Sequence, residues 1–143
     1  MPDLHTEIEV VGSVTYVKPR GNLTTDSILE ITECGFYGLT RQVFWDIRDC
    51  SLDLMSRDEY FRLSTNVRNR SVSRQTISAC FALKNVIDLR QFRYFTLISA
   101  RQTGHRVRQF LTLDMDAAWD WLKSVEHLDS WETVEHDVPM GTA

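Results

Sequence analysis

Two short apolar runs, residues 42–47 and 76–83, limit the fold of this chain more than any other feature. Each is long enough for one strand and holds few polar side chains, a pattern typical of strands that are covered on both faces. Helical patterns precede, separate and follow the two runs. Strands that alternate with helices indicate a largely parallel sheet with helices packed against it. Trp45, within the first run, is expected to be buried.

Weaker patterns complete the predicted sheet. Alternation over residues 8–16 predicts a hairpin that turns at Gly12 and Ser13 and adds an antiparallel edge to the sheet. The proline and glycine within residues 19–22 predict a turn directly after the hairpin. Residues 106–111 alternate again and predict a shorter strand near an edge of the sheet. The sequence therefore predicts about five strands.

Polar residues at helix starts place about four helices around these strands. Ser56 and Glu59 have the spacing of a capping box, and the helix that they begin is expected to stop in the polar run 68–74. The other three helical patterns begin at residues suited to N-caps: Thr24 or Thr25, Asp88 and Asp114. We therefore expect an α/β fold, with a mixed, mostly parallel sheet of about five strands flanked by about four helices.

The length of 143 residues is that of one ordinary domain, so we expect residues 1–143 to form a single unit. Its ordered core is predicted over about residues 8–123, and the acidic tail, about residues 132–143, is expected to fray. The sequence has no apolar run of about 20 residues, and its start lacks the basic and apolar regions of a secretory signal. We expect a cytoplasmic protein without membrane insertion.

Charge divides the chain into three blocks. Residues 1–56 hold nine acidic and four basic residues, residues 57–113 hold three and eleven, and residues 114–143 hold eight and one. Two explanations remain open: charge balance between faces of one domain, which we favour, and an anionic partner. The densest basic stretch, Arg68–Arg74, lacks the aromatic residues that would stack on bases, so no nucleic acid is expected.

Three stretches form a recognisable series by their order and spacing. They are Gly21–Thr24 at the entry to the first helix, Phe44–Asp49 along the first apolar run, and Phe110–Leu122, with two alanines and a final Trp-Leu pair. Together they resemble the SpoIIAA-like proteins, relatives of the STAS domain of anti-sigma-factor antagonists and sulfate transporters. The resemblance implies a small mixed sheet flanked by helices, in a protein that binds partners or ligands without performing chemistry.

The resemblance also implies a candidate phosphorylation site. In classical STAS antagonists, a partner kinase phosphorylates a serine at the start of the helix after the central strand. Ser56 is the nearest equivalent by position and Ser51 the second, although the Asp-Ser-Ser-Gly run of that family is absent here. The alternative is that the Ser56 hydroxyl serves only as an N-cap, which we favour because Glu59 would repel an added phosphate.

Asp46, Arg48 and Asp49 stand at the carboxyl end of the first apolar run, where open α/β sheets usually bind their ligands. In a functional interpretation, Asp46 or Asp49 is a general base or a ligand anchor and Arg48 holds an anion. In a structural interpretation, Arg48 pairs with a neighbouring carboxylate and fixes the loop. We favour the structural interpretation.

Phe92 and Phe95 belong to an apolar set that spreads around most of the predicted helix after Asp88. One side of this helix must pack on the sheet, and the rest would meet a second copy, a lipid or other helices. Both phenylalanines are therefore candidate contacts with a ligand or partner. Because some SpoIIAA-like proteins are compared with lipid-binding Sec14-type domains, the resemblance also allows an apolar ligand.

The remaining residue patterns do not indicate chemistry. The four histidines lack the spacing of a metal site, and motifs for phosphate binding or an activated serine are absent. The three cysteines have no paired spacing and are interpreted as core residues, with Cys50 the most accessible. We expect no metal and no cofactor.

Three functional hypotheses follow. The leading one is a non-enzymatic regulatory or protein-interaction module whose partner is another protein or a second copy. The second is a carrier of a lipid or another small apolar ligand. The third is a small enzyme that acts through Asp46, Arg48 and Asp49.

Overall fold

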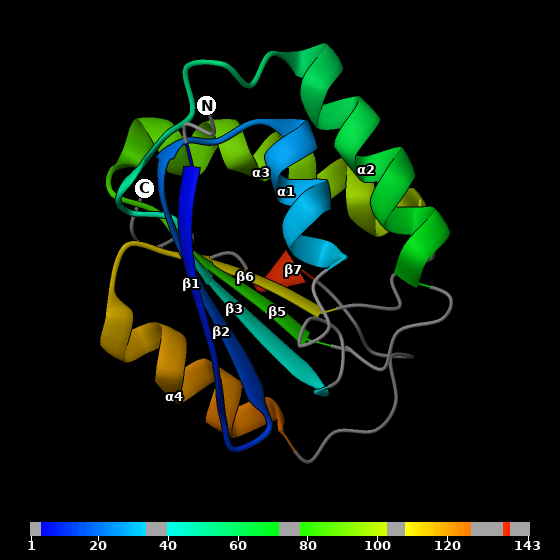
Figure 1. Cartoon of the computed structure of the whole chain (residues 1–143). Coiled ribbons are helices and arrows are strands. Elements are labelled where there is room, and N and C mark those ends of the chain that lie inside the picture. Colours follow the sequence, from blue (N-terminus) through cyan, green and yellow to red (C-terminus); the bar gives the residue numbers. More distant parts are fainter. Residues whose placement is uncertain (1–3, 34–39, 72–77, 103–107, 127–135, 138–143) are drawn as a thin grey trace.

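The computed structural model describes residues 4–33, 40–71, 78–102, 108–126 and 136–137, which form a mixed sheet with helices on both faces (Figure 1). The strands are β1 (Leu4–Val11), β2 (Val14–Asn22), β3 (Gln42–Asp46), β4 (Cys50–Ser51), β5 (Ser78–Ala82), β6 (Arg108–Thr112) and β7 (His136–Asp137). The helices are α1 (Thr25–Thr32), α2 (Arg57–Ser71), α3 (Val86–Gln102) and α4 (Met115–Val125).

The sheet has the order β1-β2-β3-β5-β6-β7, with β4 beside the end of β2. β1 is antiparallel to β2, and the other strand pairs are parallel. The predicted α/β class and the antiparallel edge are therefore confirmed. The sheet exceeds the predicted five strands by β4 and β7, which have two residues each and leave little periodicity in a sequence.

Side chains alternate between the two faces of each central strand, and each face has its own core. On β3, Val43 and Trp45 belong to the core beneath α1, α2 and α3, whereas Phe44 belongs to the core beneath α4. We call these sides the three-helix face and the α4 face (Figure 1). Trp45 is 5% exposed, so its predicted burial is confirmed.

β2 runs through the segment in which a turn was expected. The turn predicted at residues 19–22 is wrong because the strand continues to Asn22. β3 pairs with β2 as far as Val17, and β4 pairs with it from Gly21 onward, so Pro19 lies in the gap between the two pairings. Its missing N–H therefore costs no hydrogen bond to β3 or β4. Gly21 has a φ of 111°, which glycine adopts at little cost.

The helix starts follow the polar residues closely. Thr24 caps α1 and Asp114 caps α4, as predicted. α3 begins earlier than Asp88, because the Asn85 side chain accepts a hydrogen bond from the Asp88 N–H at 2.8 Å and acts as the cap. α2 ends at Ser71, within the polar run 68–74 that was predicted to end it.

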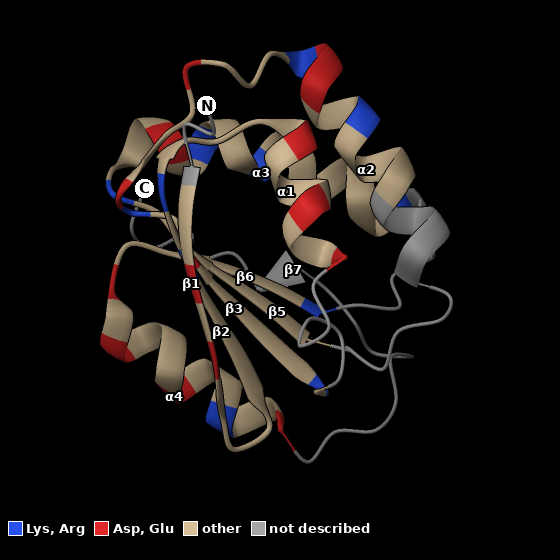
Figure 2. Ribbon diagram, in the orientation of Figure 1, with Lys and Arg blue, Asp and Glu red and all other residues tan. Residues whose placement is uncertain are grey.

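Charged side chains join elements from different blocks of the sequence. Arg62 of α2 pairs with Asp26 of α1, with an N–O distance of 3.2 Å, and with Glu59 of its own helix at 3.1 Å. Figure 2 shows further acidic positions on β1 and α4. The Arg62–Asp26 pair joins the basic block to the first acidic block, as charge balance within one domain predicts. Both Arg62 pairs are exposed, so each contributes little to stability.

Candidate functional site

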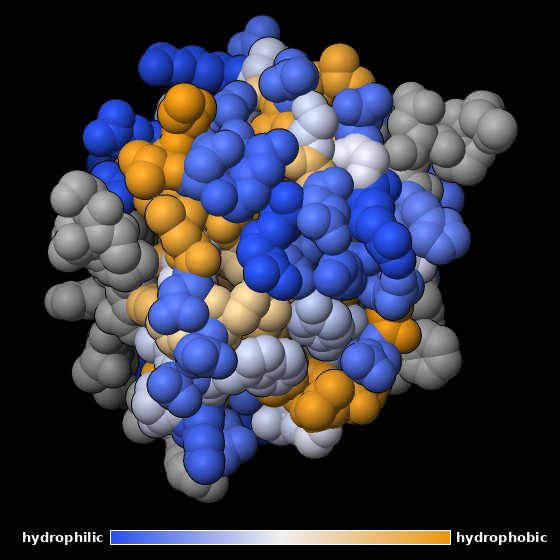
Figure 3. All heavy atoms as spheres, turned by 90° about the vertical axis from the view of Figure 1, so that its left-hand side faces the viewer, coloured by the Kyte–Doolittle hydropathy of each residue, from blue (hydrophilic) through white to orange (hydrophobic). Residues whose placement is uncertain are grey.

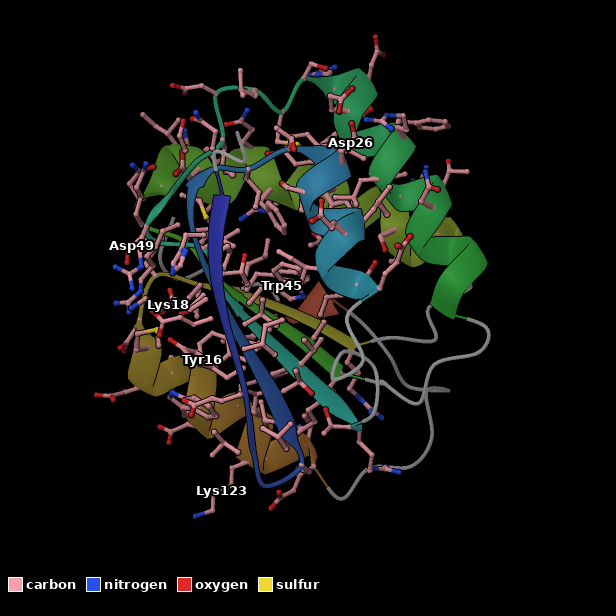
Figure 4. All side chains as sticks on the ribbon, in the orientation of Figure 1. Tyr16, Lys18, Asp26, Trp45, Asp49 and Lys123 are labelled. Atoms are coloured by element: carbon pink, nitrogen blue, oxygen red, sulfur yellow. The ribbon has the colours of Figure 1, made fainter. Side chains whose placement is uncertain are left out.

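Asp46 is the centre of a polar cluster at the carboxyl end of β3. It is the last residue of the strand and has an exposed fraction of 0%. Its side chain points to the α4 face, as does that of Phe44 two residues earlier. The neighbouring strand β2 passes alongside and brings Tyr16 and Lys18 to the same face (Figure 4).

Both oxygens of the Asp46 carboxylate accept hydrogen bonds from Arg48. The Arg48 Nε donates to Oδ1 at 2.8 Å, and its Nη2 donates to Oδ2 at 3.0 Å. The Arg48 backbone N–H also donates to Oδ1, at 3.3 Å. This bidentate pairing is the fork expected from the structural interpretation. It fixes the conformation of the chain where it leaves β3.

Tyr16, on β2, also donates a hydrogen bond to Asp46. Its hydroxyl donates to Oδ2 at 2.7 Å. The Tyr16 ring is held by Phe44 and Trp119, whose ring centroids lie 5.3 Å and 5.8 Å from it. Phe44 and Trp119 also contact each other edge to face, at 5.0 Å. The aromatic cluster therefore holds the hydroxyl in position and connects α4 to the end of β3.

Lys18 lies between two carboxylates. Its Nζ is 3.9 Å from Asp46 Oδ2 and 3.7 Å from Asp49 Oδ2, and Asp49 itself is exposed. Figure 4 shows Tyr16, Lys18 and Asp49 along the same side of the molecule. With Arg48 included, the cluster contains two negative and two positive side chains. Their charges balance, so the cluster favours neither an anion nor a cation.

The surroundings keep Asp46 ionised and Tyr16 protonated. Burial alone would raise the pKa of Asp46, but the hydrogen bonds from Arg48 and Tyr16 outweigh burial and leave this pKa below its ordinary value. Burial raises the pKa of Tyr16, and the adjacent Asp46 raises it further. The hydrogen bonds to Asp46 raise the pKa of Arg48. A carboxylate held in this way is a weak base at neutral pH.

The structure brings together three of the predicted site residues and separates the others. Asp46, Arg48 and Asp49 belong to one cluster, as described. Ser56 is exposed at the start of α2, where its Oγ accepts a hydrogen bond from the Glu59 N–H at 3.2 Å. This is the N-cap contact predicted for Ser56.

Phe92 and Phe95 lie on the three-helix face, across the sheet from Asp46, and both are buried. The Phe92 ring centroid is 4.9 Å from that of Phe81 and 5.1 Å from that of Phe95. Their rings therefore fill the core between α3 and the sheet. A role for them in ligand binding stays a prediction, and this packing gives it no support.

Cys50 was expected to be accessible to solvent, but the structure buries it. It is 1% exposed, and its Sγ donates to the Pro19 carbonyl at 3.3 Å. Burial raises the pKa of this thiol to about 12. Cys50 is buried because it belongs to β4, which pairs with β2. β4 has two residues and is too short to predict from the sequence. Cys80 is also buried, and Cys34 lies outside the described residues.

Tyr16 and Lys18 were not among the predicted site residues. Both lie in the alternating pattern of the hairpin, which shows that they share a face but does not show what lies opposite. The register that pairs Val17 with Trp45 determines what lies opposite, because it brings Lys18 level with Asp46. The sequence signal was a lysine and a tyrosine, two residues apart, on one face of an apolar strand.

The described residues include neither a metal site nor a membrane-spanning helix. Among them, no three His, Cys, Asp or Glu side chains lie close enough together to hold a metal ion. No helix in the same part of the chain combines the length and the apolar character needed to cross a bilayer.

Comparison with known proteins finds similarity to solved structures. No family model matches the chain, and no curated protein matches it. The chain is similar to an uncharacterised protein from the DUF3478 family with a SpoIIAA-like fold, from Shewanella loihica PV-4, at 16% sequence identity and a TM-score of 0.46. The similarity covers 83% of this chain and 93% of that one. The SpoIIAA-like fold is also the one that the sequence resembles.

Proposed function

We propose that this protein is a non-enzymatic module that regulates or binds another protein. The observation that carries this proposal is the state of Asp46. A general base needs an oxygen within hydrogen-bonding reach of its substrate. Both Asp46 oxygens already accept hydrogen bonds from Arg48, and Oδ2 accepts another from Tyr16. The carboxylate best placed for chemistry therefore serves to fix the loop after β3.

Exposed apolar side chains in the segments that follow the carboxyl ends of β4 and β5 also support an interaction role. Leu54, in the loop before α2, is 53% exposed, and Ile87, at the start of α3, is 74% exposed. The Gln91 side chain donates to the Met55 carbonyl at 3.3 Å, so the start of α3 lies against this loop. Figure 3 shows hydrophobic side chains gathered at the upper left of this view. Such groups are commoner at binding surfaces than elsewhere.

A comparison of substrates tests the non-enzymatic assignment. Wild-type protein and Asp46→Asn would be incubated with panels of esters, phosphate esters, peptides and glycosides, and product formation would be measured. We expect no turnover above that of a buffer control. Turnover by the wild type that disappears in Asp46→Asn, while substitution of an exposed aspartate outside the cluster, Asp53→Asn, retains it, would overturn the proposal and favour the small enzyme.

Native mass spectrometry tests the carrier hypothesis. Nothing in the packing of Phe92 and Phe95 favours a bound lipid, so we expect the purified protein to have the mass of the bare chain. A reproducible additional mass, identified as an acyl compound after denaturation, would favour the carrier. We further propose that residues 1–143 are one domain and that the protein acts in the cytoplasm, with Ser56 serving as an N-cap.

A further inference from the structure

β1 is the last strand of the sheet on its side, and its outer edge pairs with no other described strand. The hydrogen bonds of β2 determine which backbone groups lie on that edge. Gln42 N donates to Ser13 O at 3.2 Å, and Gly21 N donates to Asp49 O at 3.3 Å. Odd-numbered residues of β2 therefore direct their backbone groups toward β3 and β4, and even-numbered residues direct theirs toward β1.

The register of the hairpin transfers this alternation to β1. Val11 lies opposite Val14 and Glu7 lies opposite Lys18, so odd-numbered residues of β1 bond to β2. The even-numbered residues direct their N–H and C=O groups away from the sheet: Leu4, Thr6, Ile8 and Val10. These groups form a regular row to which an extended chain can bond.

The side chains along this row are separated by chemical type. Glu7 and Glu9 are exposed and share the face of Tyr16 and Lys18, and Figure 2 shows acidic positions along β1. The Glu7 carboxylate accepts a hydrogen bond from the Arg20 guanidinium of β2. On the opposite side, Ile8 packs against the core of the three-helix face. An incoming strand therefore meets the Glu9 carboxylate and the Arg20-paired carboxylate of Glu7 on one side, and apolar side chains on the other.

A second copy of β1 is a poor match for this edge. Antiparallel pairing centred on Ile8 places Glu7 opposite Glu9 of the other copy, and pairing centred on Glu7 places the two Glu7 side chains opposite each other. Like charges at directly opposed positions are destabilising. Pairing centred on Thr6 avoids these contacts between glutamates but limits the described partners to residues 4–8.

We propose that the outer edge of β1 docks an extended segment of another protein whose side chains alternate between basic and apolar. Its basic side chains lie opposite Glu7 and Glu9, and its apolar side chains lie opposite Thr6, Ile8 and Val10. Its backbone completes the hydrogen bonds of the even-numbered residues. The proposal rests on the interaction function proposed above and names the chemistry of the partner.

Hydrogen exchange with a synthetic peptide tests the proposal. The probe is acetyl-Thr-Val-Lys-Val-Lys-Val-Thr-amide, added to isotopically labelled full-length protein and followed by NMR. We expect the amides of Thr6, Ile8 and Val10 to exchange at least about tenfold more slowly at saturation. The amides of Glu7 and Glu9 already bond to β2 and should change little. Simple attraction between charges would not produce this alternation.

Three controls separate the contributions of backbone and charge. A peptide with N-methylated valines keeps its charge but loses the donors that face β1, so it should not protect the even-numbered amides. A peptide with glutamate in place of lysine should also fail. The variant Glu9→Lys should bind the lysine peptide about fivefold more weakly and the glutamate peptide more strongly.

The other outcomes overturn the proposal in distinguishable ways. Equal binding of the N-methylated peptide would show charge attraction without strand pairing. Protection of Thr6 and Ile8 that appears without peptide and grows with protein concentration would show that the occupant is a second copy. No protection with any peptide would exclude the outer edge of β1 as a docking site. The proposed function would remain in place, because a partner could still bind at Leu54 and Ile87.

Discussion

Tyr16 on the α4 face of the sheet and Tyr60 on the three-helix face stabilise the fold in different ways. On the α4 face, the Tyr16 hydroxyl donates to Asp46 at 2.7 Å, and its ring is held by Phe44 and Trp119. On the three-helix face, Tyr60 is 1% exposed, and its hydroxyl has no hydrogen-bond partner in the described part of the chain. One face thus uses a satisfied polar cluster, whereas the other relies on ring packing.

This difference predicts which substitutions destabilise each face. A buried polar cluster loses much when one member is removed, because its remaining groups are left without partners. An apolar core loses stability in proportion to the volume removed and tolerates the loss of an unbonded polar atom. The variants below test this contrast, in order of decreasing expected effect.

The largest effect is expected from Trp45→Ala, on the three-helix face. Removal of this buried ring should lower the free energy of unfolding by about 3–5 kcal/mol, a large part of the stability of a typical domain. Denaturant unfolding followed by circular dichroism measures it. Phe61→Ala is the matched control, because Phe61 is an exposed aromatic residue and should change the value by less than about 0.5 kcal/mol. Equal effects would mean that the Trp45 ring is not buried in solution.

Asp46→Asn should have the next largest effect, about 2–3 kcal/mol, measured by the same unfolding experiment. The amide cannot accept the bidentate bond of Arg48, but Arg48 is partly exposed and regains some solvation. Asp49→Asn is the control, since Asp49 is exposed and its carboxylate lies 3.7 Å from the Lys18 ammonium at the surface. A loss below about 0.5 kcal/mol in Asp46→Asn would show that the cluster does not stabilise the fold.

The contribution of Asp46 should depend on pH in a defined direction. Its pKa in the folded state lies below its ordinary value, so the stabilisation is complete above the unfolded value of about 3.9 and is lost as the pH falls through the folded value. We therefore expect the stability difference between wild type and Asp46→Asn to be constant from pH 7 to about pH 5 and to shrink below about pH 4. Unfolding curves over this range measure it. A difference that grows on acidification would contradict the direction of the shift.

The two tyrosines give the most direct test of the contrast. Tyr16→Phe removes a hydrogen bond to a charged group and should cost about 1.5 kcal/mol. Tyr60→Phe removes only an unbonded hydroxyl and should leave the stability unchanged or raise it by up to about 1 kcal/mol. Thermal and denaturant unfolding of both variants provides the measurement. A larger loss in Tyr60→Phe than in Tyr16→Phe would reverse the assignment of the two faces.

The smallest loss is expected at Ser56, outside both cores. Ser56→Ala removes the N-cap bond to Glu59 and should cost about 1 kcal/mol, whereas Ser56→Asp keeps a capping oxygen and should be almost neutral. Both values come from denaturant unfolding. A phosphopeptide that contains Ser56, recovered from protein purified from its own cells, would contradict a role limited to capping.

The sequence predicts the central elements well, because each depends on its own residues. The runs at 42–47 and 76–83 are apolar on both faces, and Thr24 and Asp114 are the caps that α1 and α4 use. β2 beyond Val17 could not be predicted in the same way. A proline in a strand is tolerated only where no neighbour needs its N–H, and the gap between β3 and β4 is a property of the whole sheet.

The residues of the candidate site also differ in how far the sequence alone predicts their contacts. Asp46 and Arg48 are two residues apart in the sequence, so their contact requires only local geometry, whereas Asp49 reaches the cluster through Lys18. Tyr16 and Lys18 join them through the register of β2 against β3, which depends on packing across the sheet. Phe92 and Phe95 form a strong helical pattern, but a pattern alone does not distinguish a core from a binding surface.

The fork between Arg48 and Asp46 also has a consequence for how this chain can diverge. Loss of the carboxylate removes the acceptor of both Arg48 and Tyr16, and loss of the guanidinium leaves the buried Asp46 carboxylate with only Tyr16 and Lys18 as side-chain partners among the described residues. Descendant sequences should therefore exchange these two residues together or retain both. Tyr60 is under no such restriction, and a single nucleotide change that gives phenylalanine there should persist in a lineage without a compensating change elsewhere.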